Sequence, residues 1–227
     1  MAGNPLDNPV WQALTGPHAG LATQHGLIRR YPPEIAPFAG MAEPSTAAVA
    51  GLPATIPAEG VVAIVGVAPI PIPQGTEPAL AAEVLQMAAT AFVPYPRQVD
   101  FVPLTAADVP AMLALVELTH PGPFGPRTIE MGRYIGVKSD GALVAMAGER
   151  MRLDGFTEVS AVCVHPDYRG KGYAKALVSA IATGIVAAGS VPFLHVYPDN
   201  QPAIATYEAL GFRPRRLLHF TVLKQAA

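Results

Sequence analysis

The 227-residue sequence predicts an α/β fold in which helices flank a mixed, mostly antiparallel sheet, with a smaller N-terminal part. Strand and helix patterns alternate from residue 101 onward, and a glycine-rich loop joins a strand to a helix there. Proline-rich segments divide the first hundred residues. The 21 glycines and 25 prolines make up about a fifth of the chain against an average of roughly 12%, which predicts short elements and rigid turns.

Composition and charge limit the classes of protein to which this chain can belong. Hydrophobic residues make up 51% of the chain, which excludes disorder of the whole. A net charge of −2 argues against nucleic acid or an anionic membrane as partner. The start lacks the features of a secretory signal, and no apolar run approaches the roughly 18 residues that span a bilayer. We therefore expect a cytoplasmic protein, and leave a homo-oligomer open.

The single cysteine, Cys163, excludes an intramolecular disulfide and a multi-cysteine zinc site. It lies between valines in a predicted strand, which is typical of an inert core residue. No histidine belongs to an H-E-x-x-H motif, and no serine lies in a G-x-S-x-G motif. We expect no metal and no cysteine nucleophile, and structural roles for His165 and His195.

Residues 1–98 carry no catalytic motif, and proline clusters interrupt any helical period there. Between the clusters, residues 61–67 predict a strand and residues 78–90 predict a helix. The proline-flanked stretch 93–100 predicts a boundary between two parts. We therefore expect an N-terminal part over 1–98 and a second domain over 99–227.

The elements after residue 101 follow from clearer signals. Thr105 is the predicted N-cap of a helix, with Asp108 in place of the usual Glu or Gln of a capping box. A hairpin is predicted around Gly141, and β-branched residues predict the strand after it. An apolar stripe predicts a helix from Tyr173, with Gly189 as its stop. The predicted strands are 133–138, 142–151, 157–164, 191–197 and 217–223, and a further helix is predicted over 201–210.

The loop before Tyr173 has the composition of an anion site. Gly170 and Gly172 let a ligand approach the backbone, and the N–H groups at the helix start favour a phosphate. A P-loop is excluded because Lys171 is not followed by Ser or Thr. A dinucleotide fingerprint is excluded because Lys175 stands where a glycine is required.

Two motifs in this region resemble those of the GNAT N-acetyltransferases. Arg169, Gly172 and Ala174 match the R-x-x-G-x-A pattern of the acetyl-CoA pyrophosphate loop in that family. The family's second signature, N-x-x-A-x-x-x-Y-x-x-x-G-F, is matched by Asn200, Ala203, Tyr207, Gly211 and Phe212. The resemblance covers about residues 101–223, and two-part members of the superfamily suggest a degenerate copy of the fold in 1–98.

The resemblance implies that acetyl-CoA binds as co-substrate in a V-shaped opening between strands 157–164 and 191–197. The pantetheine arm would bond to the backbone of one strand, and the diphosphate would lie on the N–H groups of the glycine loop. Asn200 would contact the pantetheine or cap the helix that follows it. The implied cofactor-binding residues are Val162, Cys163, Val164, Arg169, Gly170, Lys171, Gly172, Tyr173, Ala174, Lys175, Asn200 and Ala203.

The same resemblance implies direct attack of an amine on the thioester. Tyr207 is the expected general acid that protonates the leaving thiolate, and the alternative is an amphipathic core tyrosine. Glu158 is the candidate general base, with Glu149 as a substitute, and a salt-bridged strand carboxylate is the alternative for both. Strict alternation places Glu158, Ser160, Val162 and Val164 on one face, unless a bulge shifts the register.

The acceptor amine is not determined by the sequence. His120, Phe124 and Arg127, on the stiff loop 119–127, are candidates for the mouth of its site, and Arg127 either pairs with an acceptor carboxylate or is a plain surface residue. Two other functions stay open. One is a catalytically silent, CoA-binding regulatory module, and the other is an assembly role in which 1–98 is the docking part.

Overall fold

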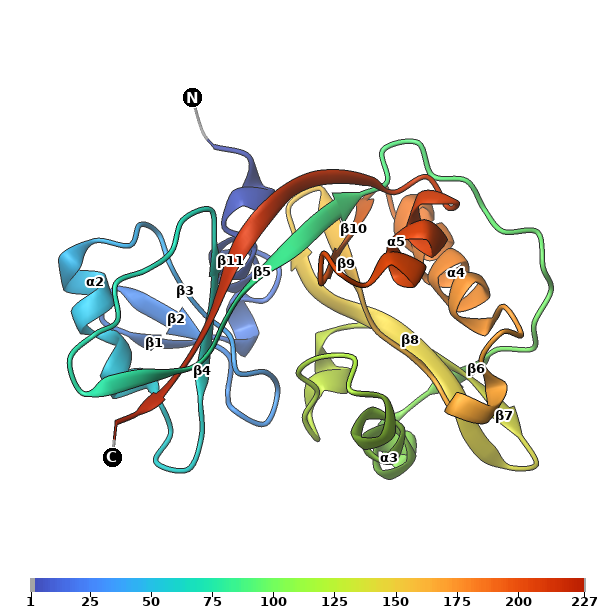
Figure 1. Ribbon diagram of the computed structural model, residues 1–227, viewed down its shortest axis with the longest axis horizontal. Helices are drawn as coiled ribbons and strands as arrows, with labels where there is room; N and C mark the ends of the chain where they lie inside the picture. The colour runs from blue at the N-terminus through green and yellow to red at the C-terminus, as the bar shows by residue number, and fades with distance from the viewer. Residues whose placement is uncertain (1–2, 227) are drawn as a thin grey trace.

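The computed structural model describes residues 3–226, which form an eight-stranded sheet and a three-stranded sheet flanked by helices (Figure 1). The strands are β1 (Thr23–His25), β2 (Ile28–Arg30), β3 (Ala39–Met41), β4 (Val62–Gly66), β5 (Thr76–Ala88), β6 (Val102–Leu104), β7 (Tyr134–Ser139), β8 (Ala142–Leu153), β9 (Phe156–Val164), β10 (Val191–Val196) and β11 (Arg213–Gln225). The α-helices are α1 (Pro9–Thr15), α2 (Thr46–Ala50), α3 (Val109–Thr119), α4 (Tyr173–Ala187) and α5 (Gln201–Glu208).

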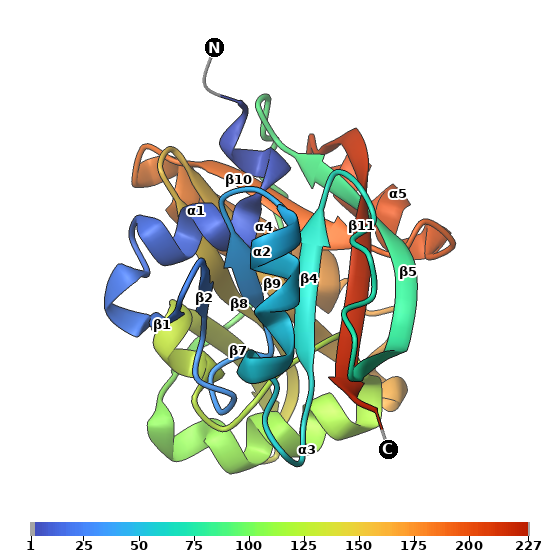
Figure 2. The same ribbon diagram turned by 90° about the vertical axis from the view of Figure 1, so that its left-hand side faces the viewer.

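The large sheet has the strand order β4-β11-β5-β10-β9-β8-β7-β6. Only β9 and β10 are parallel, and every other neighbouring pair is antiparallel. Figure 2 shows the last strand of the chain, β11, lying between β4 and β5. The mixed, mostly antiparallel sheet that the sequence predicts is therefore confirmed.

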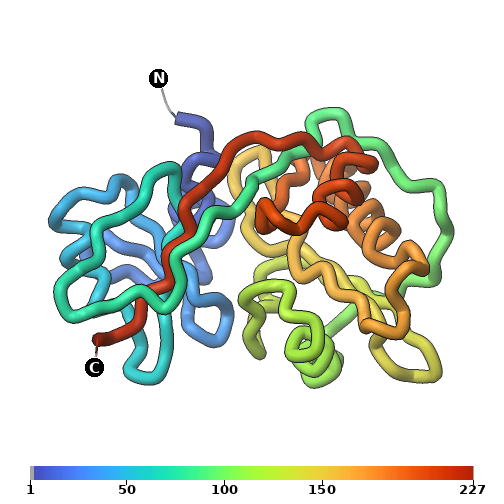
Figure 3. Tube along the Cα trace, in the orientation of Figure 1, coloured from blue at the N-terminus to red at the C-terminus, as the bar shows by residue number. Residues whose placement is uncertain are grey.

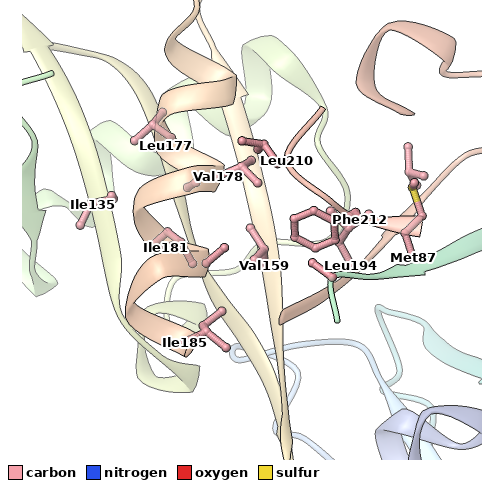
Figure 4. Packing of buried hydrophobic residues seen from close by; sticks show 14 of the residues in the cluster. Met87, Ile135, Val159, Leu177, Val178, Ile181, Ile185, Leu194, Leu210 and Phe212 are labelled. Atoms are coloured by element: carbon pink, nitrogen blue, oxygen red, sulfur yellow. The ribbon is translucent and has the colours of Figure 1, made fainter. Parts of the chain in front are cut away.

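The helices cover the two faces of the sheet differently. The buried stripe of α4 packs with α5 and the strands, and Figure 4 shows Val178 beside Leu210, with Leu177 and Ile181 on the side of the helix that faces Ile135. On the opposite face, α3 covers one part of the sheet and the N-terminal segment covers the other. Within residues 3–226, no helix is both long and apolar enough to span a bilayer.

Most elements predicted after residue 101 are confirmed. The Asp108 carboxylate accepts a hydrogen bond from the Thr105 backbone N–H at 2.9 Å and completes the capping box before α3. Asp140 and Gly141 turn the β7–β8 hairpin with positive φ angles of 50° and 82°. The helix from Tyr173 ends before Gly189, whose φ is 77°. β4 is confirmed as well, and the last strand begins four residues earlier than predicted, at Arg213.

The predicted helix over residues 78–90 is wrong, because these residues form β5. Ala, Leu, Glu, Gln and Met favour a helix by local propensity. Instead, β5 pairs with β11 on one side and β10 on the other, so both of its edges are hydrogen-bonded. Partners more than one hundred residues away in the sequence therefore override the local preference.

The boundary predicted between 1–98 and 99–227 falls in the segment that joins β5 to β6. Two strands before this boundary, β4 and β5, belong to the same sheet as the strands after it. The chain's two parts are therefore joined by backbone hydrogen bonds as well as by side chains. The division into two units, and the degenerate fold in 1–98, stay predictions.

The N-terminal layer contains a buried histidine. The Nδ1 atom of His18 lies 2.9 Å from the phenolic oxygen of Tyr31, and the two rings meet edge to face. The pKa of His18 is lowered to about 4, mainly by burial and to a smaller extent by the charge of Arg152. The side chain is therefore held neutral in a place where an imidazolium is unfavourable.

We expect the His18→Gln variant to lose part of the protein's acid sensitivity. Above pH 6.5, His18 is neutral in both the folded and the unfolded chain, so it does not change the free energy of unfolding. Between pH 6.5 and 4, the unfolded chain binds a proton at this histidine and the folded chain does not, so the free energy of unfolding falls as the pH falls. This linkage removes about 3 kcal/mol of stability over that window. Urea unfolding at pH 7 and pH 4.5 measures it, with the exposed His25→Gln as control. An unchanged pH dependence in His18→Gln would contradict the assignment.

Candidate active site

The site begins where β9 and β10 separate. Their parallel pairing ends at Glu158 and Phe193, while β9 keeps β8 as its partner as far as Val164. Ala161, with φ 51°, lies in a bulge where the β8–β9 register shifts by one residue. The predicted V-shaped opening is therefore present, and the bulge marks its wall.

The bulge also changes which side chains share a face. Val159 packs in the core under α4, and after the bulge so do Val162 and Val164, whereas Ala161 and Cys163 pack toward α3. Glu158, Ser160, Val162 and Val164 therefore do not all share one face, because a bulge shifts the register of β9, which is the alternative left open for this strand.

A cavity of about 250 Å³ occupies the opening. Tyr207 and Asn200 line it from the α5 side, and Glu158, Ser160 and Val162 line it from β9. The loop after α3 and the strands β4, β5 and β11 line it further. The cavity therefore connects the predicted cofactor side of the sheet with the face covered by α3 and the N-terminal segment.

The glycine loop has the features of an anion site. Gly170 and Gly172 both have a φ of 74°, which side chains other than glycine rarely adopt. No side chain caps α4 among residues 3–226, so the N–H groups of its first turn stay available. The Lys171 ammonium lies 4.4 Å from the Tyr168 ring centroid, and Lys175 lies 4.8 Å from that of Tyr95. These features fit a diphosphate.

Arg97 was missed by the sequence analysis. Figure 3 shows its segment running in green along the outside of the molecule beside α4, where the Tyr95 N–H donates to Ser179 Oγ at 2.8 Å. The Arg97 guanidinium donates to the Lys171 carbonyl, and a Cβ on Gly172 would lie 2.6 Å from its Nη1. The sequence offers one signal for Arg97, because it is a basic residue in the proline-flanked segment 93–100.

Tyr207 lies on α5, lines the cavity and packs against Phe212 with ring centroids 6.1 Å apart. Burial, and to a smaller extent the nearby Cys163, raises the pKa of Tyr207 to about 12. The phenol therefore stays protonated at physiological pH and is able to donate a hydrogen bond into the cavity.

Glu158 is fully buried and heavily bonded. It accepts from Arg150 Nε and Nη2 at 2.8 and 2.7 Å, and from His195 Nδ1 at 2.7 Å. Burial alone would raise the pKa of Glu158, but the Arg150 charge and these hydrogen bonds outweigh it and lower the pKa to about 2. Glu158 is therefore an ionised, paired carboxylate and a weak base.

The network continues away from the cavity. Gln86 Nε2 donates to His195 Nε2 at 3.1 Å and to the Leu6 carbonyl at 3.0 Å, while its Oε1 accepts from Arg215 at 2.9 Å. Both ring nitrogens of His195 are thus engaged, in agreement with a structural role. The sequence does not reveal this role of Gln86, because its pattern over residues 78–90 predicts a helix.

The other predicted residues are placed as follows. Asn200 caps α5 by accepting from the Ala203 N–H at 3.3 Å, and it also lines the cavity. Arg169 is exposed in the glycine loop. Burial raises the pKa of Cys163 to about 11, which agrees with an inert thiol.

The predicted mouth of the acceptor site is only partly present. His120 lines the cavity. Phe124 instead packs edge to face on Tyr134, and Arg127 pairs with Glu130 at 2.6 Å. Glu149 is not among the lining residues and pairs with Arg152 at 2.6 Å. Among residues 3–226, no group of three or more His, Cys, Asp or Glu side chains is arranged to hold a metal ion.

Comparisons with known proteins agree with this site. The family model described as FR47-like protein matches residues 134–220. The N-alpha-acetyltransferase RimI of Mycobacterium tuberculosis is 37% identical over 83 residues, which are 35% of this chain and 51% of the relative. The ribosomal protein bS18-alanine N-acetyltransferase of Salmonella typhimurium is 30% identical over 115 residues, which are 48% of this chain and 77% of the relative. The chain thus spans about half the length of the first relative.

Solved structures extend the similarity to the whole chain. A crystal structure from Novosphingobium aromaticivorans, assigned to the GNAT family of acetyltransferases, has a TM-score of 0.93 at 41% identity and covers 99% of this chain and 100% of its own. A GCN5-related N-acetyltransferase from Kribbella flavida shares the fold, with a TM-score of 0.58 at 18% identity over 96% of both chains.

The separated strands, the uncapped glycine loop and the cavity match the kind of site that the resemblance to the GNAT N-acetyltransferases implies. The chain belongs to the GNAT family of N-acetyltransferases. Members of this family use acetyl-CoA as co-substrate.

We expect Arg150→Met to destabilise the protein strongly, because it leaves the Glu158 carboxylate buried without its cation. Breaking a buried pair from one side costs roughly 3–5 kcal/mol. The double variant Arg150→Met with Glu158→Gln should recover part of the loss, since no unpaired charge remains. Urea unfolding measures both, with Arg127→Met, which breaks an exposed pair, as control. Equal stability of Arg150→Met and the control would contradict a buried pair.

Proposed function

We propose that this protein is an acetyl-CoA-dependent N-acetyltransferase in which an amine attacks the thioester directly, with Tyr207 as general acid. The observation that carries the proposal is the cavity, which brings Tyr207 to the free edge of β9 within the opening. The uncapped glycine loop supports it at the cofactor end. No covalent enzyme intermediate is needed, because positioning and electrostatics supply most of the rate.

The chain's own residues would hold the cofactor along one path. The backbone of Val162, Cys163 and Val164 would bond to the pantetheine arm as an added strand does. The N–H groups from Gly170 to Lys175 would receive the diphosphate, with Arg169, Lys171 and Arg97 as nearby cations. Asn200 and Ala203, at the start of α5, would close the other side. Acetyl-CoA supplies the activated acetyl group.

Tyr207 would act as a donor to the leaving sulfur. A thiol has a pKa of about 8.5, so complete transfer from a phenol of pKa about 12 is uphill by three to four powers of ten. The phenol would therefore donate a hydrogen bond as charge develops on sulfur. Full transfer becomes favourable when the proton that the attacking amine releases replaces the proton that Tyr207 gives to the sulfur.

Glu158 is unsuited to remove the amine's proton directly. An alkylammonium of pKa about 10.4 exceeds the pKa of Glu158, about 2, by roughly eight powers of ten. We propose instead that the proton leaves through water in the cavity. Glu158, held in place by His195, and Ser160 form the polar floor that would order this water.

The decisive test combines binding and turnover. Calorimetry with CoA should detect binding, and release of free thiol from acetyl-CoA should depend on an added amine. Binding without turnover across a broad amine panel would favour a regulatory CoA-binding module. Absence of CoA binding by folded protein would overturn the proposal.

We expect Tyr207→Phe to lower kcat at least about tenfold while CoA affinity stays nearly intact, since the variant removes only the proton donor. Tyr134→Phe is the matched control, because the buried Tyr134 hydroxyl has no hydrogen-bond partner within residues 3–226. Thiol release measures kcat, and calorimetry measures affinity. Unchanged turnover in Tyr207→Phe would mean that another group protonates the sulfur.

We expect Arg97→Ala to weaken CoA binding about three- to tenfold, because it removes a cation beside the phosphate loop. Affinity for S-acetylpantetheine, which has no phosphates, should not change. Arg127→Ala, far from the loop, is the control for loss of one exposed arginine. If Arg97→Ala weakened both ligands equally, its effect would be structural.

A further inference from the structure

The cavity extends from Tyr207 and Asn200 to a space built largely by the first hundred residues and the last strand. Its apolar lining there consists of Phe38, Val65 on β4, Val84 on β5 and Phe220 on β11. Phe220 pairs with Val65, and Val84 pairs with Leu218, two residues from Phe220, so these side chains share one face of the sheet. The register thus gives the acceptor end a continuous apolar wall.

This end carries no surplus charge. Only two of the lining residues belong to the Asp, Glu, Lys and Arg types, and these are Arg150 and Glu158. They neutralise each other through two hydrogen bonds at 2.7 and 2.8 Å. The Arg150 guanidinium also lies 4.9 Å from the Phe38 ring centroid, so one of its faces is covered. The cavity therefore offers no free carboxylate to a second ammonium group.

We infer that the acceptor is a small primary monoamine with an apolar body, a conclusion that rests on the proposed function. A polyamine or aminoglycoside carries several ammonium groups, and each one buried here would lose its hydration without gaining a counter-ion. An apolar body instead displaces water from Phe38, Val84 and Phe220. The cavity of about 250 Å³ is smaller than most ligand sites and would be shared with the thioester, so the space left for the acceptor favours a free amine over a protein chain.

The same environment assists the chemistry. Only the neutral amine attacks the thioester, and an alkylammonium in water is almost entirely protonated at pH 7. An apolar and electrically neutral wall disfavours the charged form of a bound amine. The acceptor end thus promotes loss of the proton that Glu158 cannot take directly, and specificity and activation arise from one set of side chains.

The first test compares acceptors with the unmodified 227-residue chain. We expect kcat/KM for 2-phenylethylamine and isoamylamine to exceed that for spermidine, kanamycin and a hexapeptide by at least about tenfold. Calorimetric binding of the amines to the CoA-loaded protein should follow the same order without needing turnover. The inference is overturned if a polycation or the peptide is preferred, or if the apolar amines neither bind nor react.

The second test adds a charge to the wall. Val84→Glu should shift the kcat/KM ratio of spermidine to 2-phenylethylamine upward by at least about tenfold, since it supplies the missing carboxylate. Leu80→Glu is the matched control, because Leu80 lies on the same face of β5 but is exposed and outside the cavity. Equal ratios in both variants would contradict the assigned wall. If Val84→Glu does not fold, the acceptor comparison on the unmodified protein decides alone.

The two proposals fail in different ways. If the protein does not bind CoA and releases no thiol with any amine, the acetyltransferase proposal itself is wrong. If it binds CoA and turns over a polyamine best, the acetyltransferase proposal stands and only the inferred acceptor class is overturned.

Discussion

The structure depends on the point at which β9 stops pairing with β10. Up to Glu158 and Phe193 the two strands form an ordinary parallel pair, and beyond it the sheet is open. An open edge leaves backbone groups without partners in the sheet, and these groups are free to pair with water, another chain or a ligand. The bulge at Ala161 lets β9 bend away from β10 while it stays bonded to β8. The cavity, the exposed edge and the position of Tyr207 all follow from this separation.

Such an opening weakens the sheet at its centre, and the structure offsets this with side chains. A chain of polar contacts, buried from Glu158 to Gln86 and partly exposed at Arg215 and Asp7, runs from Arg150 through Glu158, His195 and Gln86 to Arg215 and Asp7. It crosses β8, β9, β10, β5 and β11 and ends in the N-terminal segment. Every member has a partner, which is the condition under which buried polar groups are tolerated. The first residues of the chain are therefore coupled to the floor of the site.

The sequence predicts the turns and the helix cap of the candidate site better than its strands, for a physical reason. A phosphate loop and a helix cap are local, since glycine spacing and neighbouring residues determine them, and Gly170, Gly172 and Asn200 lie where expected. The bulge at Ala161 has no local signature, so the sequence leaves open which residues of β9 share a face after Ser160. β5 consists of good helix formers and is a strand only because β10 and β11 bond to both its edges.

The same distinction explains why motifs alone do not identify the acceptor. The proposed acceptor wall combines Phe38, Val65, Val84 and Phe220, which are up to 182 positions apart in sequence and meet only through the fold, including the pairing of β4, β11 and β5. Apolar residues in strands look alike wherever they pack. Their role becomes visible only when the fold places them around a neutral cavity beside Arg150 and Glu158. On the proposed function, acceptor choice would depend on tertiary contacts, whereas binding of the cofactor would depend on short stretches of chain.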